Sequence, residues 1–518
     1  ANGRVAQLQV NVGTQITTTQ LIASTAVYPA GTVIYTTGFT SSGDGGKGGW
    51  KQNGVTVQTP SQTPSQLLSG LLNDGNGNQW QLVSTAGTAN KEIHTMSLGV
   101  VRNGANAAIP IQAAINWGGA RCVIINPPGV LNVSTPMVIS EDNVVFEGAG
   151  YNTTSFARTA DYGNTISVVK AASYINHVVL KNFNISNNAS APVSLGAEIE
   201  ITAGVFCIIE SVRVVGMSAV GLRFYGCQQM KINLLRCQAT GTYNSSRYGL
   251  KFMPRPAGFP GTPGNNNAVT ITNSEIDTPF GPNSALASFQ AGIYIEAMDG
   301  FNMSTTRVGG ANLANIHINN INSGTFISHI IIDNNFFDLA PGRSILTQGS
   351  TGDMDGLTIS NNHLGSTINS IIGIDLQGNL KSSAIKGNRL IFWGDSGISV
   401  GGSVSSLRII GNDINKYNRK NLSNNRGVQI ADNWTGSNVI ISDNIIDPGT
   451  NNAGKGIRVG AGNNVSVTGN RILNNLDGID IELGVTDYLI TSNNLVGNTN
   501  AITDDGGAVN KVVANNLT

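Results

Sequence analysis

The chain repeatedly places one polar residue at a fixed phase between apolar residues. The stretch "VSVTGNRI" (465–472) has the same outline as "LTISNNHL" (357–364) and "VIISDNII" (439–446). In each stretch an apolar residue is followed three places later by Asn and five places later by another apolar residue. The frame recurs in succession from Ile332, Ile359, Ile385, Ile409, Ile441, Val467, Ile490 and Val512, with Asn335, Asn362, Asn388, Asn412, Asn444, Asn470, Asn493 and Asn515 at its third place.

The spacing between successive frames indicates the kind of repeat. Upstream, the frame continues without Asn from Leu180, Ile209, Ile232, Ile271 and Met303, which gives about thirteen repeats over residues 180–517. Successive Asn-containing frames, from Ile332 to Val512, are 22 to 32 residues apart. These steps are too long for six- or nine-residue β-rolls and too variable for a leucine-rich horseshoe. Helical repeats would need apolar spacings of three and four residues. The sequence therefore predicts an all-β fold, a right-handed parallel β-helix of about thirteen coils with three short strands in each coil.

The repeated Asn has a physical explanation in such a coil. Asn tolerates the left-handed backbone conformation that a sharp turn between two strands requires. Its amide can also donate to the Asn one coil away, so that a buried row of amides satisfies its own polar groups. We therefore expect a ladder of buried Asn side chains along one inner corner.

A second strand pattern, "GIxI", lies between these frames, as in "GIYIEAM" (292–298) and "GIDIELG" (478–484). Its apolar residues are expected to point inward and the alternating residues outward. The outward column reads Glu200, Arg223, Lys251, Tyr294, Glu296, His317, Asn319, Leu346, Gln348, Asp375, Gln377, Ser399, Gln429, Arg458, Asp480 and Glu482. This surface is the predicted place for binding or catalysis.

The N-terminal part of the chain differs from the repeats. Residues 1–95 combine short strand patterns with Gly-rich turns, which predicts a small β-rich leader domain. Residues 96–150 contain a short amphipathic helix, Ile109 to Trp117, followed by strand patterns. Because a solenoid needs its open end covered, we expect this helix to cap the β-helix. The third predicted domain, residues 151–518, is the β-helix itself.

The composition limits the partners of this surface. Only 12% of the residues are charged, and 30 basic residues balance 30 acidic ones, so nothing suggests nucleic acid. A neutral surface rich in hydroxyl and amide groups suits carbohydrate. The four cysteines show no metal-ligand spacing, and neither a metal nor another cofactor is expected. No run approaches 18 apolar residues, so no membrane span is expected.

Several motifs together resemble a known family. A β-rich leader with "GDGGKGGW" (43–50) is followed by "IQAAI" (111–115), "NPPG" (126–129) and the repeats. This layout resembles bacteriophage tailspike proteins, the capsular or exopolysaccharide depolymerases of the pectate-lyase-like parallel β-helix superfamily. The resemblance implies a homotrimer on the virion, attached to the phage tail through its N-terminal part. It also implies that the protein binds and cleaves the host's surface polysaccharide outside the cell.

Two long Pro-containing insertions suggest where a binding groove could form. Residues 253–268 and 277–291 flank the strand that carries Tyr294 and Glu296. Long structured loops on a rigid scaffold are usual places for binding residues. Substrate-binding residues are therefore expected to include Arg223, Lys251, Tyr294, His317, Asp375 and Trp393.

Hydrolysis is the preferred chemistry for this groove. A glycoside hydrolase uses two carboxylates, and the preferred acid/base pair is Glu296 with Asp299. Asp375 and Asp333 are substitutes. Asp375 lies three coils from Glu296, or ~14 Å at the strand spacing, which is too far to act as its partner.

Elimination is the alternative chemistry. A lyase removes the proton from the carbon beside a uronic carboxylate, so it needs a base and a group that neutralises the acid. Lys251, His317 or Tyr294 could be the base. Arg223 could hold the carboxylate.

Other residues leave further interpretations open. Trp393 and Trp434 are expected in turns, where an exposed ring would stack on sugar and a packed ring would cover its own coil. Acidic glycan or a neighbouring subunit could be bound by Arg307, Arg343, Tyr417, Arg419 and Arg426. Because a fold does not determine a function, a non-catalytic glycan-binding spike is a third possibility.

Overall fold

The computed structural model describes residues 18–26, 28, 30–36, 48–56, 71–76, 78–83, 91–98, 100, 106–160, 162–187, 196–217, 219–239, 247–259, 264–277, 289–321, 324–338, 341–349, 352–365, 371–417, 425–450, 453–507 and 510–518. The chain divides into two compact units, Ala1–Val215 and Gly216–Thr518. Among the described residues, no helix has the length and the apolar character needed to cross a membrane.

The first unit begins with a small antiparallel sheet. Its elements are α1 (Thr18–Ile22), β1 (Val33–Thr36), β2 (Gly48–Thr56), β3 (Leu71–Asn73) and β4 (Asn78–Val83). The four strands are ordered β1-β2-β4-β3. Trp50 and Trp80 are fully buried in it, and the indole N–H of Trp80 donates to Asp74 at 2.8 Å. A buried indole thus keeps its hydrogen bond. Residues 43–47 of the "GDGGKGGW" motif lie outside the described residues.

The rest of the first unit is built mostly from parallel strands. Its elements are β5 (Lys91–His94), η1 (Thr95–Leu98), α3 (Ala108–Gly118), β6 (Cys122–Ile125), β7 (Gly129–Val133), β8 (Met137–Ile139), β9 (Val145–Glu147), β10 (Thr154–Arg158), β11 (Ile166–Val168), β12 (Ile175–Asn176), β13 (Val179–Asn187), β14 (Ala197–Thr202), β15 (Gly204–Val205) and β16 (Ile208–Val215). The predicted helix is present as α3, one residue longer at each end than expected. It buries Ile111, Ala114 and Ile115 and packs against β5, β6 and β8, the first strands of the stack.

The predicted domain boundaries do not coincide with a break in strand stacking. Strand β5, inside the predicted leader, pairs in parallel with β6, and β6 pairs in parallel with β9. Both β6 and β9 precede residue 151, where the β-helix was expected to start. Within the part of the chain that the structure describes, the parallel stacking thus includes Lys91, which lies in the predicted leader.

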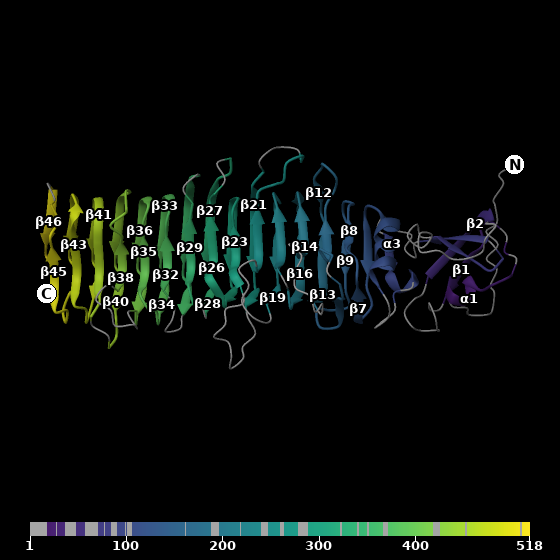
Figure 1. Ribbon diagram of the computed structural model, residues 1–518, viewed down its shortest axis with the longest axis horizontal. Coiled ribbons are helices and arrows are strands. Elements are labelled where there is room, and N and C mark those ends of the chain that lie inside the picture. Colours follow the sequence, from purple (N-terminus) through teal and green to yellow (C-terminus); the bar gives the residue numbers. More distant parts are fainter. Residues whose placement is uncertain are drawn as a thin grey trace, which may run out of the picture. The chain divides into compact units, whose positions relative to one another are not determined.

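The second unit is a parallel β-helix with three strand columns, which we call faces 1, 2 and 3 (Figure 1). Face 1 consists of β17 (Val220–Tyr225), β20 (Tyr248–Met253), β23 (Phe289–Ile295), β26 (Ala311–Asn319), β29 (Arg343–Gln348), β32 (Ile372–Leu376), β35 (Ser396–Val400), β38 (Arg426–Ile430), the first half of β41 (Lys455–Thr468), β43 (Asp477–Val485) and β45 (Asn500–Asp504). Face 2 consists of β18 (Lys231–Asn233), β21 (Asn266–Thr272), β24 (Met298–Ser304), β27 (Ile327–Asp333), β30 (Met354–Ser360), β33 (Asn379–Lys386), β36 (Ser403–Ile410), β39 (Ser437–Ser442), the second half of β41, β44 (Asp487–Thr491) and β46 (Asn510–Ala514). Face 3 consists of β19 (Arg236–Gln238), β22 (Glu275–Asp277), β25 (Arg307–Gly309), β28 (Phe336–Asp338), β31 (His363–Gly365), β34 (Arg389–Ile391), β37 (Asp413–Asn415), β40 (Ile445–Asp447) and β42 (Arg471–Ile472).

The strand register of face 2 follows the predicted frames. From Ile232 to Ile490, each frame's first residue pairs with the next frame's first residue. The last frame is wrong by one residue, because Ile490 pairs with Val513 and not with Val512. The apolar residues at the first and last places of these frames are buried and fill the core of the coil.

The predicted Asn ladder is confirmed. From Asn335 onward, the backbone N–H and the side-chain N–H of each ladder Asn both donate to the amide oxygen of the Asn one coil later, at 2.9–3.0 Å. The last acceptor is Asn516, so the expected Asn515 was wrong by the same single-residue shift.

The left-handed conformation lies one residue earlier than expected. It is adopted by Asn334, Asn361, Gly387, Gly411, Asp443, Gly469, Ser492 and Asn515, with φ between 53° and 69°. The ladder Asn is therefore selected for its amide, and the tight turn is made by the residue before it.

Candidate functional site

The outward column that the sequence predicts on face 1 is continuous through the second unit. Register pairs join Arg223, Lys251, Tyr294, His317, Leu346, Asp375, Ser399, Gln429, Arg458 and Asp480 in that order. Consecutive strands stand ~4.8 Å apart, so neighbouring residues of the column lie within reach of one ligand. Two groups of polar side chains occur along it.

The first group, the upstream cluster, consists of Arg223, Tyr248, Lys251, Tyr294, Glu296, His317, Asn319 and Gln348. The ammonium nitrogen of Lys251 lies 4.8 Å from the ring centre of Tyr248 and 5.2 Å from that of Tyr294. The ring of Tyr294 lies 5.3 Å from the rings of both Tyr248 and His317. These contacts hold a cation, two phenols and an imidazole on three consecutive strands.

The polar atoms of the upstream cluster are connected by hydrogen bonds. The Tyr294 hydroxyl contacts the Glu296 carboxylate and accepts from the Asn319 amide at 3.3 Å. His317 donates from Nε2 to the Gln348 amide oxygen at 3.0 Å, which leaves its Nδ1 lone pair as an acceptor. The structure therefore offers a proton acceptor and a hydroxyl side by side.

Burial sets the protonation of the cluster. Tyr294 is 7% exposed, and its burial together with the Glu296 carboxylate raises the pKa of the phenol, so it keeps its proton at neutral pH. Burial and the Arg223 guanidinium lower the pKa of Lys251, while Glu296 opposes them. His317 is 5% exposed, and burial lowers its pKa to about 4, so its imidazole is neutral at neutral pH.

The low pKa of His317 predicts a pH dependence of stability. In the unfolded chain the imidazole binds its proton near pH 6.5, but in the fold it does so only near pH 4. The unfolded state therefore binds more protons as the pH falls from 6.5 to 4, and the fold loses up to roughly 3 kcal/mol over this window. Urea unfolding at a series of pH values should show this loss in the wild type and a shallower one in His317→Gln. Equal slopes for both proteins would contradict the burial of a neutral imidazole.

The structure places Asp299 on a different face from Glu296. Glu296 follows the last residue of β23 on face 1, whereas Asp299 is the second residue of β24 on face 2. The Asp299 carboxylate accepts from the Ser328 hydroxyl at 2.6 Å and lies 3.2 Å from His329 Nδ1. A corner of the coil thus stands between the two residues of the predicted pair.

The two substitute carboxylates already have partners. Asp375 is 3% exposed and accepts from Arg343 Nε at 2.6 Å and from the Gln377 amide at 2.8 Å. It lies three strands from Tyr294 in the column, as expected. Asp333 lies on face 2 and accepts from the Ser360 hydroxyl at 2.6 Å. Both substitute carboxylates are therefore held by neighbouring side chains.

The prediction that Trp393 binds sugar is wrong in this structure. Its ring has no exposed surface and packs against Gly373 on the preceding coil. Trp434 is likewise buried, with its indole N–H donating to the Val404 carbonyl at 2.6 Å. A turn in a β-helix lies directly over the next coil, so a large apolar ring there covers the core.

Parts of the predicted groove cannot be placed. Residues 260–263 and 278–288, the middle parts of the two insertions, lie outside the described residues, as does Arg419. The ends of both insertions are described and lead into β21 and β23. Among the described residues, no group of His, Cys, Asp and Glu side chains could hold a metal ion.

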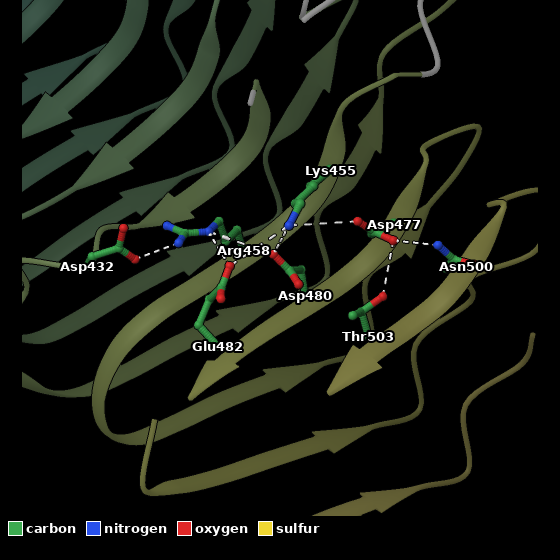
Figure 2. A network of polar contacts seen from close by, with 8 residues as sticks. All are labelled: Asp432, Lys455, Arg458, Asp477, Asp480, Glu482, Asn500 and Thr503. Carbon is green, nitrogen blue, oxygen red and sulfur yellow. Dashed lines mark hydrogen bonds and ion pairs between the residues drawn. The ribbon is translucent and has the colours of Figure 1, made fainter. Parts of the chain in front are cut away.

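The second polar group, the downstream network, consists of Asp432, Lys455, Arg458, Asp477, Asp480 and Glu482 (Figure 2). Lys455 forms a close ion pair with Asp480 and lies 3.8 Å from Asp477 and 3.9 Å from Glu482. Arg458 donates to Asp432 at 2.6 Å and to Glu482 at 3.0 Å. Burial raises the pKa of Asp480, although Lys455 opposes the shift.

Sequence reasoning placed Arg458, Asp480 and Glu482 in the outward column but did not recognise them as a network. A signal was present in "GIDIELG", where Asp480 and Glu482 alternate with apolar residues and must emerge on the same side of β43. Their cationic partners come from β41, one coil earlier.

Comparison with known proteins addresses the fold. Neither a protein-family model nor a curated protein matches this chain. A double mutant of the tailspike protein of Escherichia coli bacteriophage HK620, solved in complex with a pentasaccharide, aligns over 82% of this chain and 80% of its own. The identity is 12% and the TM-score is 0.62. The fold is a tailspike-like parallel β-helix.

Two further tailspike structures align with lower scores. The Dettilon tailspike protein aligns over 80% of this chain and 68% of its own, with 13% identity and a TM-score of 0.49. Full-length tailspike protein 2 of Escherichia coli O157:H7 bacteriophage CAB120 aligns over 89% of this chain, with 12% identity and a TM-score of 0.45. This chain spans only about half, 52%, of the length of that protein.

Proposed function

We propose that this protein is a phage tailspike depolymerase that binds and cleaves a bacterial surface polysaccharide at the upstream cluster. The observation that carries the proposal is the unbroken column Arg223, Lys251, Tyr294 and His317 on face 1, with Glu296 beside Tyr294. It combines cations, a proton acceptor and a proton donor within the span of a few sugar units. The protein acts as a homotrimer on the virion, attached to the tail through its N-terminal part and exposed to the host surface.

Elimination is the chemistry that this column supports best. Arg223 and Lys251 neutralise the carboxylate of a uronic acid unit, and His317, neutral at neutral pH, takes the proton from the adjacent carbon through Nδ1. The electron pair of that C–H bond forms a carbon–carbon double bond as the bond to the glycosidic oxygen breaks. The Tyr294 hydroxyl, which keeps its proton, supplies a proton to the leaving oxygen.

Hydrolysis is the second candidate, and one contact favours it. The Glu296 carboxylate is 6% exposed and touches the Tyr294 hydroxyl, which is a suitable place for a general acid. Asp299 would then serve as the base from the other side of the corner, with a water molecule between the two carboxylates. This arrangement corresponds to an inverting hydrolase, whose carboxylates stand about 6.5–9.5 Å apart.

Digestion of purified capsular and lipopolysaccharide polysaccharides from a panel of bacteria tests the proposal. We expect new reducing ends together with the ultraviolet absorbance of a double bond conjugated to a carboxylate. Reducing ends without this absorbance would favour hydrolysis by Glu296 and Asp299. Binding without release of oligosaccharides would favour a non-catalytic spike, and neither binding nor cleavage would contradict the proposed function.

A further inference from the structure

Among the residues that the structure describes, Arg426 carries a buried guanidinium that forms no hydrogen bond or ion pair. It is the first residue of β38 and only 7% of its surface is exposed. Its Nε has no hydrogen-bond partner, and no ion pair or hydrogen bond joins its guanidinium to another described residue. A buried guanidinium normally binds a carboxylate or another acceptor, because an unpaired buried charge is costly. Arg426 thus has donors that a ligand could use.

The Arg426 guanidinium lies next to the residues of the downstream network. Register places Arg426 beside Lys455, which is followed in the same row by Asp477. The pKa of Arg426 is lowered by its burial and by Arg458, whereas the carboxylates of Asp480, Asp432 and Glu482 act in the opposite direction. Arg426 is therefore close enough to four of the residues drawn in Figure 2, Asp432, Arg458, Asp480 and Glu482, to interact with them electrostatically.

The network also offers acceptors that reach solvent. The side chains of Asp432 and Glu482 are 70% and 34% exposed, while that of Asp480 is 3% exposed. Arg458 Nε lies 3.7 Å from a carboxylate oxygen of Asp480 and 3.0 Å from one of Glu482. The two carboxylates are therefore close neighbours that share the same guanidinium nitrogen. Donors and acceptors are thus placed alternately over a small area.

The charges of the site indicate the class of ligand. Three cations, Arg426, Lys455 and Arg458, stand among four carboxylates, Asp432, Asp477, Asp480 and Glu482. An anion would gain little in this field, because the carboxylates outnumber the cations. A sugar hydroxyl accepts from a guanidinium and donates to a carboxylate at the same time, so neighbouring hydroxyls match this pattern.

We propose that Arg426 and the downstream network form a second glycan-binding site, which holds the hydroxyl groups of a neutral sugar unit. The site lies on the same face as the upstream cluster, six strand spacings from Tyr294 to Arg458, or ~29 Å. One extended polysaccharide chain along face 1 therefore reaches both sites. This inference rests on the proposed function, since it assigns the second site to the same polymer.

The test compares affinity for short and long oligosaccharides. An array of purified bacterial surface polysaccharides first identifies one that the wild type binds, and partial acid hydrolysis of it gives a ladder of lengths. Calorimetry in a Tyr294→Phe background, in which cleavage is expected to be about 10²–10⁴-fold slower, then measures each affinity. We expect Arg426→Ala to weaken binding about tenfold for oligosaccharides that span ~29 Å and to leave di- and trisaccharides at the upstream cluster unaffected. Glu482→Gln should act in the same direction.

Arg408→Ala is the matched control, because Arg408 is an exposed arginine of β36 on face 2. It should bind all lengths as the wild type does, and melting curves should show that each variant is folded. Equal affinities of Arg426→Ala and wild type at every length would overturn the second site, as would equal weakening at every length. If the wild type bound none of the polysaccharides on the array, the proposed function itself would fail.

Discussion

Replacing Tyr294 by Phe is expected to lower the kcat of polysaccharide cleavage by about 10²–10⁴-fold, the usual contribution of a general acid or base. The phenol lies at the centre of the upstream cluster, in contact with Glu296 and Asn319 through its oxygen. Phe retains the ring contacts with Lys251 and His317 and removes only the hydroxyl. KM should therefore change little, because binding by the ring and the cations is kept.

Steady-state assays of reducing ends measure this effect, with Tyr151→Phe as the matched control. Tyr151 is 43% exposed and belongs to the first unit, so its variant should keep the wild-type kcat. A kcat of Tyr294→Phe within a factor of two of wild type would show that the hydroxyl takes no part in the reaction.

Glu296→Gln separates the two candidate chemistries. In elimination the Glu296 carboxylate only raises the pKa of the Tyr294 phenol and transfers no proton itself. Glu296→Gln should therefore retain more activity than Tyr294→Phe. In hydrolysis Glu296 transfers the proton itself, and Glu296→Gln should lose as much as Asp299→Asn.

The fold could be predicted from the sequence because a parallel coil stacks each strand on the next one in sequence. The apolar frame fixes the inward residues, and a one-residue slip would turn them outward, so the pairs from Ile232 to Ile490 were predicted correctly. The last coil was shifted because Val512 and Val513 are both apolar and Asn515 and Asn516 are both Asn. There the pattern contains no information that distinguishes the two registers.

The place of the left-handed residue was also available from the sequence. Gly387, Gly411 and Gly469 precede their ladder Asn residues, and Gly is the residue that adopts positive φ most easily. The sequence pattern predicts that the ladder Asn both adopts the left-handed conformation and forms the amide hydrogen bonds. In the structure the preceding residue adopts the left-handed conformation, and the Asn forms the hydrogen bonds.

For the candidate site, the alternation of side chains along each strand predicted which residues share a face, and nothing more. The period of two placed Lys251, Tyr294 and His317 correctly in one column. It does not reveal where a strand ends, so the corner between Glu296 and Asp299 was missed. Burial in three dimensions was missed as well, because the local sequence does not show what covers a turn.

Replacing Asn412, an interior member of the Asn ladder, by Ala is expected to destabilise the fold strongly. Asn412 is 1% exposed, and its amide oxygen accepts from both the backbone N–H and the side-chain N–H of Asn388. Without it, the buried backbone N–H of Asn388 has lost its acceptor. The carbonyl groups of Ile385 and Ile410 also lose a donor. An unsatisfied buried polar group costs about 1–3 kcal/mol, so the variant should lose about 3 kcal/mol of unfolding free energy.

Denaturant unfolding and amide hydrogen exchange measure this loss. Asn302→Ala is the control, because Asn302 is exposed on β24 of face 2 and outside the ladder. Its unfolding free energy should stay within about 0.5 kcal/mol of the wild type. Exchange of the Asn388 amide proton should accelerate strongly in Asn412→Ala, since this proton has lost its acceptor. If both variants were equally stable, the coil would have to satisfy Asn388 in another way, and the amides would not be what fixes the stacking of successive coils.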